Sequence, residues 1–167
     1  MTVEAPLEEV VVSASRIPER LDQVLGSVSL ITRADIEQNM TSDIAGLLEK
    51  LGNVDVIHNG GPGQTVSVFL RGANSNQTLV LLDGVRLNPG TIGVASIQNI
   101  SPELVDRIEV VRGTRSSIYG SDAMGGVINI ITRSPKGSGI DLSADTATYQ
   151  THNVTLTGYT GTETDKI

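Results

Sequence analysis

The stretch that decides the fold is RIEVVRGTRSSIYGSDAMGGVINIITR, residues 107–133. Its first five residues, RIEVV, are typical of a β-strand, and the run VINIIT near its end is nearly apolar on both faces. A strand that is apolar on both faces usually lies inside a sheet that is covered on each side. We therefore predict strands at residues 107–111 and 126–132, the second of them central in its sheet.

The segment before this stretch contains the sharpest turn signal in the chain. In TLVLLDGVRL, residues 78–87, two β-prone runs flank Asp83-Gly84, the dipeptide favoured in two-residue hairpin turns. We predict a β-hairpin there. A further strand is predicted at residues 66–70, where apolar and polar residues alternate.

Two short helices are predicted nearer the N-terminus. Thr32 can cap the first helix, in which Asp35 and Glu37 favour the positive end of the helix dipole. Thr41 or Ser42 can cap the second helix.

The second helix is predicted to be amphipathic. Its apolar residues recur at three- and four-residue spacing until Gly52 ends it, and they are Ile44, Leu47, Leu48 and Leu51. Strands are expected before and after the two helices, at residues 27–32 and 54–57. Short helices mixed with strands that partly form local hairpins indicate an α+β fold with a small mixed sheet.

Composition and charge exclude several classes of function. The 167 residues carry a net charge of −7, so they lack the basic surface that a nucleic-acid-binding protein needs. The absence of Cys excludes disulfides, thiolate metal sites and cysteine nucleophiles. Aromatic residues make up only 2% of the chain, so the core must consist of Val, Ile and Leu.

No motif for catalysis or for metal binding is complete. His58 and His152 are far apart in the sequence and lack a nearby acidic cluster. The sequence NGGPGQT, residues 59–65, lacks the Gly-Lys-Ser/Thr ending of a phosphate-binding loop. The residues around Asp122 lack the frame of a nucleophile elbow, and Asp122 is expected to cap the following turn. We therefore expect no enzyme, no cofactor and no metal site.

The N-terminal run EEVVVSAS, residues 8–15, is predicted to be a short isolated strand that ends before Pro18. A strand outside the core is suited to strand addition, in which main-chain hydrogen bonds to a partner supply the affinity. An ordinary edge strand is the alternative.

The tail beyond residue 137 has a different character. Ile140, Leu142 and Ala144 alternate with polar residues, and a second alternating run begins at Val154. The pattern predicts two strands with one apolar face each. It fits the wall of a transmembrane barrel, but by itself it favours a half-buried hairpin whose other face meets solvent.

Three separated motifs resemble those of one known family, in the family's order. LEEVVVSASR (residues 7–16) resembles the Ton box, whereas FLRGANSNQTLVLLDGVRLN (69–88) and the stretch 107–133 resemble the plug domain of TonB-dependent outer-membrane receptors. One departure is Thr114, where the family commonly has Pro. The resemblance implies an α+β plug with a small mixed four-stranded sheet, short helices and long apical loops, followed by one or two barrel-like strands.

The resemblance also implies how the chain is divided and where it is located. Residues 1–17 would be an N-terminal segment with the Ton-box-like motif, residues 18–137 the plug, and residues 138–167 the start of an incomplete barrel. The plug would lie inside a barrel in the outer membrane of a Gram-negative bacterium, with its N-terminus towards the periplasm. Because such a barrel has about 22 strands, this chain could not transport a ligand by itself.

Two protein partners are implied by the resemblance. The C-terminal domain of TonB would pair with the Ton box, at Glu8, Glu9, Val10, Val11, Val12, Ser13 and Ala14. The receptor's own β-barrel would be contacted by arginines, because Arg pairs bidentately with carboxylates. These residues are Arg71, Arg86, Arg107, Arg112, Arg115 and Arg133, for which the alternative is ordinary surface exposure or ion pairing inside the plug.

Within the family, the loops look most like those of receptors for cobalamin, or vitamin B12. Cobalamin bears many amides, so side chains with amide and hydroxyl groups are the expected ligand contacts. They are Asn59, Gln64, Asn74, Asn88 and Thr91. The alternatives are the plug of an iron-siderophore or haem receptor, a free-standing periplasmic binding or adaptor module with the plug fold, and a small hydrolase.

Overall fold

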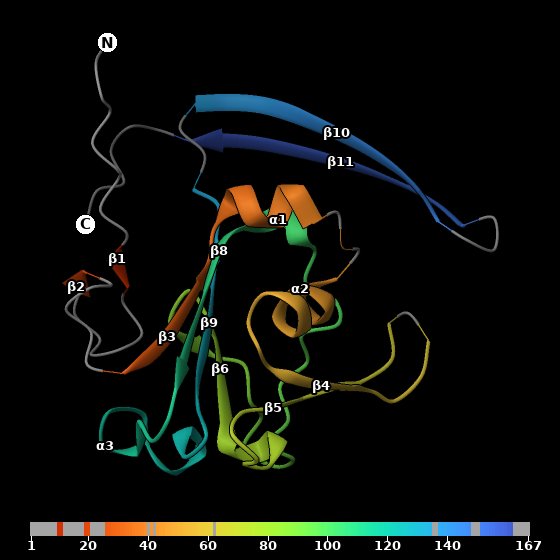
Figure 1. The fold of residues 1–167 in the computed structure, drawn as a ribbon. Helices are drawn as coiled ribbons and strands as arrows, with labels where there is room; N and C mark the ends of the chain where they lie inside the picture. The colour runs from red at the N-terminus through yellow and green to blue at the C-terminus, as the bar shows by residue number, and fades with distance from the viewer. Residues whose placement is uncertain are drawn as a thin grey trace. The chain divides into compact units, whose positions relative to one another are not determined.

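The computed structural model divides the chain into two units, Met1–Thr132 and Arg133–Ile167. The first unit contains a mixed β-sheet with short helices, and the second contains one β-hairpin (Figure 1). The residues that the structure describes are 10–11, 19–20, 26–39, 41, 43–61, 63–134, 137–147 and 151–161. Among these residues, no helix is long and apolar enough to cross a membrane.

The main sheet of the first unit has five strands in the order β3-β8-β9-β6-β7. Strands β6 and β9 are parallel, whereas the other neighbouring pairs are antiparallel. The five strands are β3 (Ser27–Ile31), β8 (Val105–Arg112), β9 (Gly126–Thr132), β6 (Thr78–Leu82) and β7 (Val85–Arg86). The α+β fold with a mixed sheet is confirmed. The predicted count of four strands is one too low, because the two-residue strand β7 adds to the edge.

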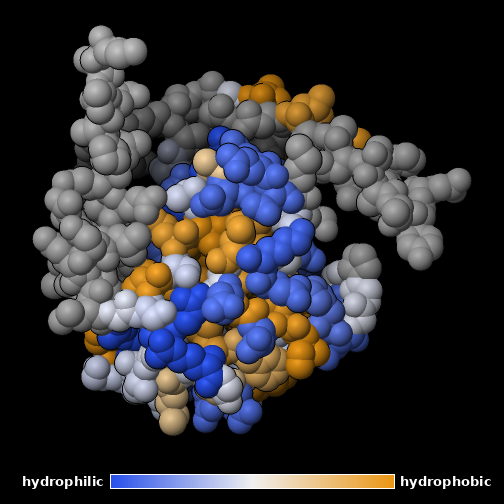
Figure 2. Space-filling model, in the orientation of Figure 1, coloured by the Kyte–Doolittle hydropathy of each residue, from blue (hydrophilic) through white to orange (hydrophobic). Residues whose placement is uncertain are grey.

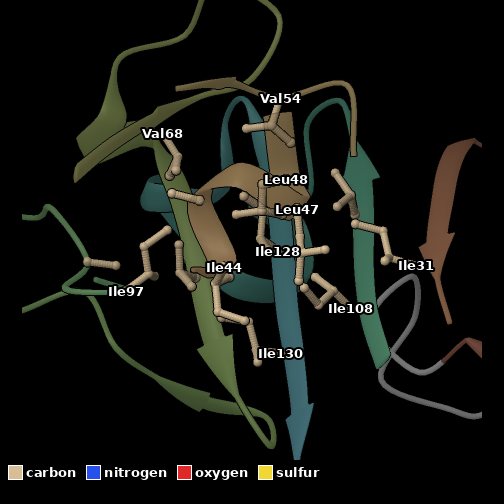
Figure 3. Packing of buried hydrophobic residues seen from close by; sticks show 14 of the residues in the cluster. Ile31, Ile44, Leu47, Leu48, Val54, Val68, Ile97, Ile108, Ile128 and Ile130 are labelled. Atoms are coloured by element: carbon tan, nitrogen blue, oxygen red, sulfur yellow. The ribbon is translucent and has the colours of Figure 1, made fainter. Parts of the chain in front are cut away.

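Strand β9 is central, as its apolar sequence predicts. It lies between β8 and β6, and its residues from Gly126 to Ile130 are buried. Ile108, Ile128 and Ile130 point to the same side of the sheet, where they pack in the main core with residues of α2 (Figure 3). The core is aliphatic, in agreement with the scarcity of aromatic residues.

Helix α1 (Arg33–Asn39) begins at the predicted cap. The Thr32 hydroxyl accepts a hydrogen bond from the N–H of Asp35 (3.3 Å), and the Asp35 carboxylate accepts one from the Thr32 N–H (2.9 Å). This reciprocal arrangement is a capping box. The hydrogen bonds from the Thr32 hydroxyl and N–H lower the pKa of Asp35, because they favour its charged form.

Helix α2 (Ile44–Lys50) is capped by a residue other than those predicted. The Asp43 carboxylate accepts a hydrogen bond from the Gly46 N–H at 2.7 Å, so the cap lies after Thr41 and Ser42. The predicted apolar stripe is confirmed, because Ile44, Leu47 and Leu48 are buried and Leu51 packs against them. An apolar area below α1 lies between hydrophilic surfaces in Figure 2.

Two further strands form a separate two-stranded sheet. Strands β4 (Asp55–His58) and β5 (Val66–Phe69) are antiparallel and are joined by the Gly-rich loop. Val66 and Val68 are buried on one face of this sheet and contribute to the main core.

The hairpin predicted around Asp83-Gly84 is confirmed. Strands β6 and β7 are joined by these two residues, whose φ angles are 50° and 80°. Positive φ at both central positions is what a type I′ turn requires, and Asp-Gly tolerates it.

Short helical turns complete the first unit. One of them is a single 3-10 turn with Pro at its first position, η3 (Pro102–Leu104). The other turns are η2 (Ser75–Gln77), α3 (Ser116–Tyr119) and η4 (Ser121–Ala123). The expected capping role of Asp122 is wrong, because Gly120 occupies the cap position and Asp122 lies within η4.

The N-terminal strand is not isolated as predicted. Strand β1 (Val10–Val11) pairs antiparallel with β2 (Glu19–Arg20), so that Val10 is opposite Arg20 and Val11 is opposite Glu19.

The second unit is the two-stranded sheet that the alternating tail predicts. Strands β10 (Gly137–Ala147) and β11 (Thr151–Gly161) are antiparallel, with Leu142 opposite Leu156 and Ala144 opposite Val154. The large apolar side chains of the hairpin are highly exposed, at 75% for Ile140, 71% for Leu142, 72% for Val154 and 70% for Leu156.

Candidate functional site

The predicted ligand residues lie on two separate loops. Asn59 and Gln64 are exposed in the loop between β4 and β5. The Asn59 N–H donates to the Thr65 carbonyl at 3.1 Å, and the Gln64 N–H donates to the Gly61 carbonyl at 3.1 Å. The loop is therefore held by its own backbone, and both amide side chains stand at its surface.

Asn74 and Thr91 belong to a second group, at the end of the main sheet where β6 begins. Both residues are exposed, and the Asn74 N–H donates to the Gln77 side-chain oxygen at 3.1 Å. The loop that follows β7 packs against the η2 turn here. A Cβ atom on Gly93 would lie only 2.8 Å from the Cβ atom of Asn76.

Asn88 differs from the other predicted ligand residues, because its side chain points into the protein. It is 4% exposed, and its oxygen accepts a hydrogen bond from the Val80 N–H at 2.7 Å. Its amide nitrogen donates to the carbonyl oxygens of Thr78 and Gly93, at 3.1 and 2.6 Å. Both amide hydrogens are thus used inside the protein rather than offered at the surface.

Sequence reasoning passed over Ile92, which stands beside Thr91 in the same loop. It is 73% exposed, the highest value among the large apolar residues of the first unit whose side chains the structure describes. The sequence feature that could have indicated it is a single large aliphatic residue inside a loop of Gly, Pro and Thr. Together with the amides and hydroxyls nearby, it gives this end of the sheet a surface with polar and apolar groups.

This loop lies at the end of the sheet opposite the chain exit. Thr78 pairs with Gly126 at one end, whereas Leu82 pairs with Ile130 near the other end, where β9 finishes at Thr132. In Figure 1, α3 is at the end where β9 begins, and the chain leaves β9 at the opposite end.

Two of the predicted barrel-facing arginines form ion pairs within the first unit. Arg86 lies 3.0 Å from the Asp122 carboxylate, and Arg107 lies 3.2 Å from the carboxylates of Asp106 and Glu109. Glu109 is fully buried, so Arg107 balances a charge that is removed from water. The pairing of these two arginines follows the alternative that the sequence left open.

Arg112 joins three segments of the chain. Its guanidinium donates to the hydroxyls of Ser27 and Ser29, at 3.4 and 3.0 Å, and to the carbonyl of Gly52. Partial burial lowers the pKa of Arg112, and the positive charge of Arg71 lowers it further. Two like charges therefore lie close together at this end of β8.

The remaining predicted arginines lie at the ends of elements. Arg115 is the residue before α3, and its guanidinium reaches towards Gly26. Arg133 follows β9 and is the first residue of the second unit.

Of the predicted Ton box, the structure describes only Val10 and Val11, the two residues of β1. Their strand is paired with β2, as noted above. The other five residues, Glu8, Glu9, Val12, Ser13 and Ala14, lie outside the described part of the chain.

A metal site is not apparent in the described ranges, because they contain no group of three His, Asp or Glu side chains that could hold an ion. His58 is exposed at the end of β4, and the Ser121 hydroxyl donates to Asp122 at 3.1 Å. The Asp122 carboxylate is also paired with Arg86.

Comparison with known proteins gives one family. Residues 20–127 match the model of the TonB-dependent Receptor Plug Domain. The chain is 48% identical over 128 residues to the vitamin B12 transporter BtuB of Vibrio cholerae serotype O1, and this match covers 77% of the chain and 21% of the transporter. The chain thus spans about a fifth of the length of the curated relatives that it matches.

Solved structures show the same fold. The ferric yersiniabactin uptake receptor FyuA of Yersinia pestis superposes with a TM-score of 0.66 at 21% identity, over 84% of this chain and 22% of that receptor. The siderophore receptor PiuA of Acinetobacter baumannii gives 0.64 at 26% identity, over 90% and 21%. The family match, the sequence identity and the fold agree, and the chain belongs to the family of TonB-dependent receptor plug domains.

Proposed function

We propose that this chain is the plug and ligand gate of a receptor that takes up cobalamin across the outer membrane. As a plug domain of a TonB-dependent receptor, it lies in the outer membrane inside a β-barrel. Its relatives are receptors and transporters, so the chain is not an enzyme. The observation that carries cobalamin as the ligand is the 48% identity to a vitamin B12 transporter.

The plug of an iron-siderophore receptor is the second candidate. It is supported by the structural similarity to PiuA and FyuA, which are named for a siderophore and for ferric yersiniabactin. Their identities of 26% and 21% are well below the 48% shared with the vitamin B12 transporter. A haem receptor is the remaining alternative within the family.

In this proposal the two loops supply one wall of the ligand site. Asn59, Gln64 and Asn74 offer exposed amides, and Thr91 offers an exposed hydroxyl, to a ligand that itself carries many amides. Ile92 offers an apolar contact beside them. The barrel would supply the opposite wall, so that the ligand becomes enclosed only in the complete receptor.

The pair formed by Arg71 and Arg112 is proposed to face an acidic group of the barrel wall. Within the described residues, neither guanidinium takes part in an ion pair, and their like charges repel each other. A carboxylate between them would relieve this repulsion through charge-assisted hydrogen bonds. Contacts of Arg115 and Arg133 with the barrel also stay proposals. Arg86 and Arg107 have carboxylate partners inside the unit.

The N-terminal segment is proposed to bind the C-terminal domain of TonB. Val10 and Val11 already adopt the extended backbone that strand addition requires. A partner that captured this segment could pull on the plug, and the plug would then shift or partly unfold to open a path. Its short elements make such local opening plausible.

Uptake by the complete receptor tests the ligand. The receptor that carries this plug would be expressed in a Gram-negative strain that lacks its own cobalamin receptor but retains TonB. We expect TonB-dependent uptake of radiolabelled cyanocobalamin, and no uptake of ferric enterobactin or haem. Uptake of an iron complex without cyanocobalamin would overturn the assignment of the ligand.

Titration of the 167-residue chain separates a plug from an autonomous binding module. A plug alone supplies only one wall of the site. It therefore leaves more of the ligand's surface in water than a good site does, which buries about 70–90% of that surface. We therefore expect no binding of cyanocobalamin at submicromolar concentration. Submicromolar binding by the chain itself would favour the free-standing module.

A further inference from the structure

The amide of Asn88 connects strand β6 to the loop that follows β7. It accepts a hydrogen bond from the Val80 N–H at 2.7 Å and donates to the Thr78 carbonyl at 3.1 Å, both on β6. Its second amide hydrogen goes to the Gly93 carbonyl at 2.6 Å, five residues further along the chain. One side chain thus closes the loop 88–93 onto the edge of the sheet.

Only a primary amide of this length can make the three contacts. Asn supplies one acceptor oxygen and one nitrogen with two donor hydrogens on the same carbon, whereas ionised Asp supplies acceptors only, and Ala supplies neither. The group is 4% exposed, so its hydrogen bonds are shielded from competition with water.

The loop that Asn88 closes has little freedom left. The Gly93 N–H donates to the Pro89 carbonyl at 2.9 Å, and Gly93 adopts a φ of 73°. Gly93 also packs so closely against Asn76 that an added Cβ atom would lie 2.8 Å from the Asn76 Cβ. Between these fixed points, Thr91 and Ile92 are exposed and carry the loop's hydroxyl and large apolar side chain.

We infer that Asn88 is a positioning residue for ligand binding: it fixes the loop that presents Thr91 and Ile92, and it does so without touching the ligand. The inference rests on the proposed function, in which this loop forms part of the ligand wall. A loop that is already ordered loses less conformational entropy when the ligand binds, so its order raises the affinity. Asn88 therefore changes from a predicted ligand contact to the residue that holds the contacts in place.

Two substitutions separate positioning by hydrogen bonds from simple packing. Asn88→Asp keeps the volume but loses both donors and places a carboxylate against the carbonyls of Thr78 and Gly93. Asn88→Ala loses volume as well but introduces no repulsion. If Asn88 only filled space, Asn88→Ala would be the more harmful change, whereas positioning by donated hydrogen bonds makes Asn88→Asp at least as harmful.

Cobalamin uptake by the complete receptor is the first measurement. Losing the two donated hydrogen bonds should raise the KM for cyanocobalamin about tenfold in Asn88→Asp, with Vmax per receptor unchanged. A merely structural role would lower the number of folded receptors, and hence the total Vmax, at constant KM. A KM within twofold of the wild-type value in both Asn88 variants would overturn the inference.

Matched variants at two exposed apolar residues show whether the loop itself matters. Ile92→Asp changes the outward tip of the loop, and Val85→Asp changes a residue of β7 that is exposed to a similar degree, at 68% against 73%. We expect a raised KM for Ile92→Asp and a wild-type KM for Val85→Asp. Equal effects of the two variants would contradict a specific role for the loop.

If the Asn88 variants do not reach the outer membrane, Gly93→Ala provides a second test of the loop. The substitution strains a residue with φ of 73° and pushes it from Asn76, so it displaces the loop, and with it the Gly93 carbonyl that accepts from Asn88, while the Asn88 side chain itself is unchanged. We expect it to raise KM. An unchanged KM in correctly inserted Gly93→Ala receptor would overturn the inference.

Amide hydrogen exchange in the 167-residue chain tests the role of Asn88 separately from the proposal that cobalamin is the ligand. If the wild-type receptor takes up no cyanocobalamin, the proposed ligand is wrong, and the role of Asn88 is then judged by exchange alone. We expect the N–H groups of Val80 and Gly93 to exchange at least tenfold faster in Asn88→Ala, at unchanged exchange of residues 127–131. Unchanged exchange at Gly93 would show that Asn88 does not hold the loop.

Discussion

Asp83 has two roles at the turn between β6 and β7. Its backbone takes the φ of 50° that the turn requires, and its carboxylate accepts hydrogen bonds from the N–H and the hydroxyl of Thr132, at 2.8 and 2.7 Å. Its own N–H donates to the Ile130 carbonyl at 2.9 Å. Asp83 therefore holds the last residues of β9 at the point where the first unit ends.

A double-mutant cycle measures this contact. Asp83→Asn keeps a residue that tolerates positive φ, and Thr132→Val removes the hydroxyl at similar volume. We expect each change to lower the free energy of unfolding by about 1 kcal/mol, with a coupling of about 0.5–1 kcal/mol between them. Urea denaturation of the four proteins gives these values, and strictly additive effects would contradict a direct contact.

The cap of α1 makes stability depend on pH. Asp35→Ala removes the carboxylate that accepts from Thr32, so it should cost about 1 kcal/mol at pH 7. The hydrogen bonds lower the pKa of Asp35 in the folded state. The stabilisation is therefore fully present above the unfolded pKa of about 4 and is lost as the pH falls through the folded pKa.

Urea denaturation of Asp35→Ala and of the wild type, at pH 7 and in acid, checks this expectation. The difference between the two proteins should shrink in acid. Glu49→Ala is the matched control, because Glu49 is an exposed acid on α2. A difference for Asp35→Ala that stayed constant down to pH 2 would show that the charged form is not what the cap stabilises.

The roles of single residues were predicted well where the contacts that decide them lie nearby in the sequence. Thr32 caps α1 as predicted, because its partners lie within three residues. At α2 three neighbouring polar residues could act as the cap, and the sequence did not single out Asp43. The burial of Asn88 depends on contacts with Val80 and Thr78, eight and ten residues away, which no local pattern reveals.

At the scale of elements, strands with a strong pattern or next to a clear turn signal were predicted, and the two-residue strand β2 was missed. The apolar run of β9 and the Asp-Gly turn each have one clear structural solution. The two-residue strand β2 has no period to detect, so the paired state of β1 was not foreseen. The equally short β7 was predicted only because the Asp-Gly turn marks it as the second strand of a hairpin. Only one turn of 3-10 helix follows Pro102, because β8 begins at Val105.

The N-terminal strand allows a test of partner binding. In Val10→Pro combined with Val11→Pro, two adjacent amide hydrogens are lost and φ is fixed, so strand addition to the TonB C-terminal domain should weaken at least tenfold. Val10→Ala combined with Val11→Ala keeps both amides and should bind nearly as well as the wild type. Isothermal titration calorimetry measures both, and equal affinity of the wild type and the double-proline variant would exclude main-chain recognition at β1.

At the scale of the whole molecule, pairing between distant strands was beyond local reasoning. The parallel pair β6 and β9 joins residues 48 positions apart, since Thr78 is opposite Gly126. The order β3-β8-β9-β6-β7 follows from such long-range contacts rather than from any one segment. The contacts of the proposed receptor with its ligand and its barrel are less predictable still. This chain supplies only the plug residues of each contact, and the partner residues belong to other parts of the receptor or to the ligand.

The hairpin of the second unit is expected to be less stable than the main sheet. A two-stranded sheet is marginal in water, and Ile140, Leu142, Val154 and Leu156 are each more than two-thirds exposed. In dilute solution we expect amide exchange across residues 140–156 to be faster than across residues 127–131. Equal protection would show that the hairpin is packed on the core or on a second molecule.

The edge position of β3 has a mechanical consequence. Strand β3 is parallel to β9, so Ser27 lies at the end opposite Thr132. Among the strands that the structure describes, β3 has one neighbour in this sheet, β8. A force applied before Ser27 and directed towards the Thr132 end would peel β3 from β8, loading one backbone pair at a time from Ser27 opposite Arg112 onward. A force in the reverse direction would load all five pairs in shear. Peeling needs far less force, so the direction of pulling, and not only its strength, decides whether the sheet yields at this edge while the parallel centre of β6 and β9 stays intact.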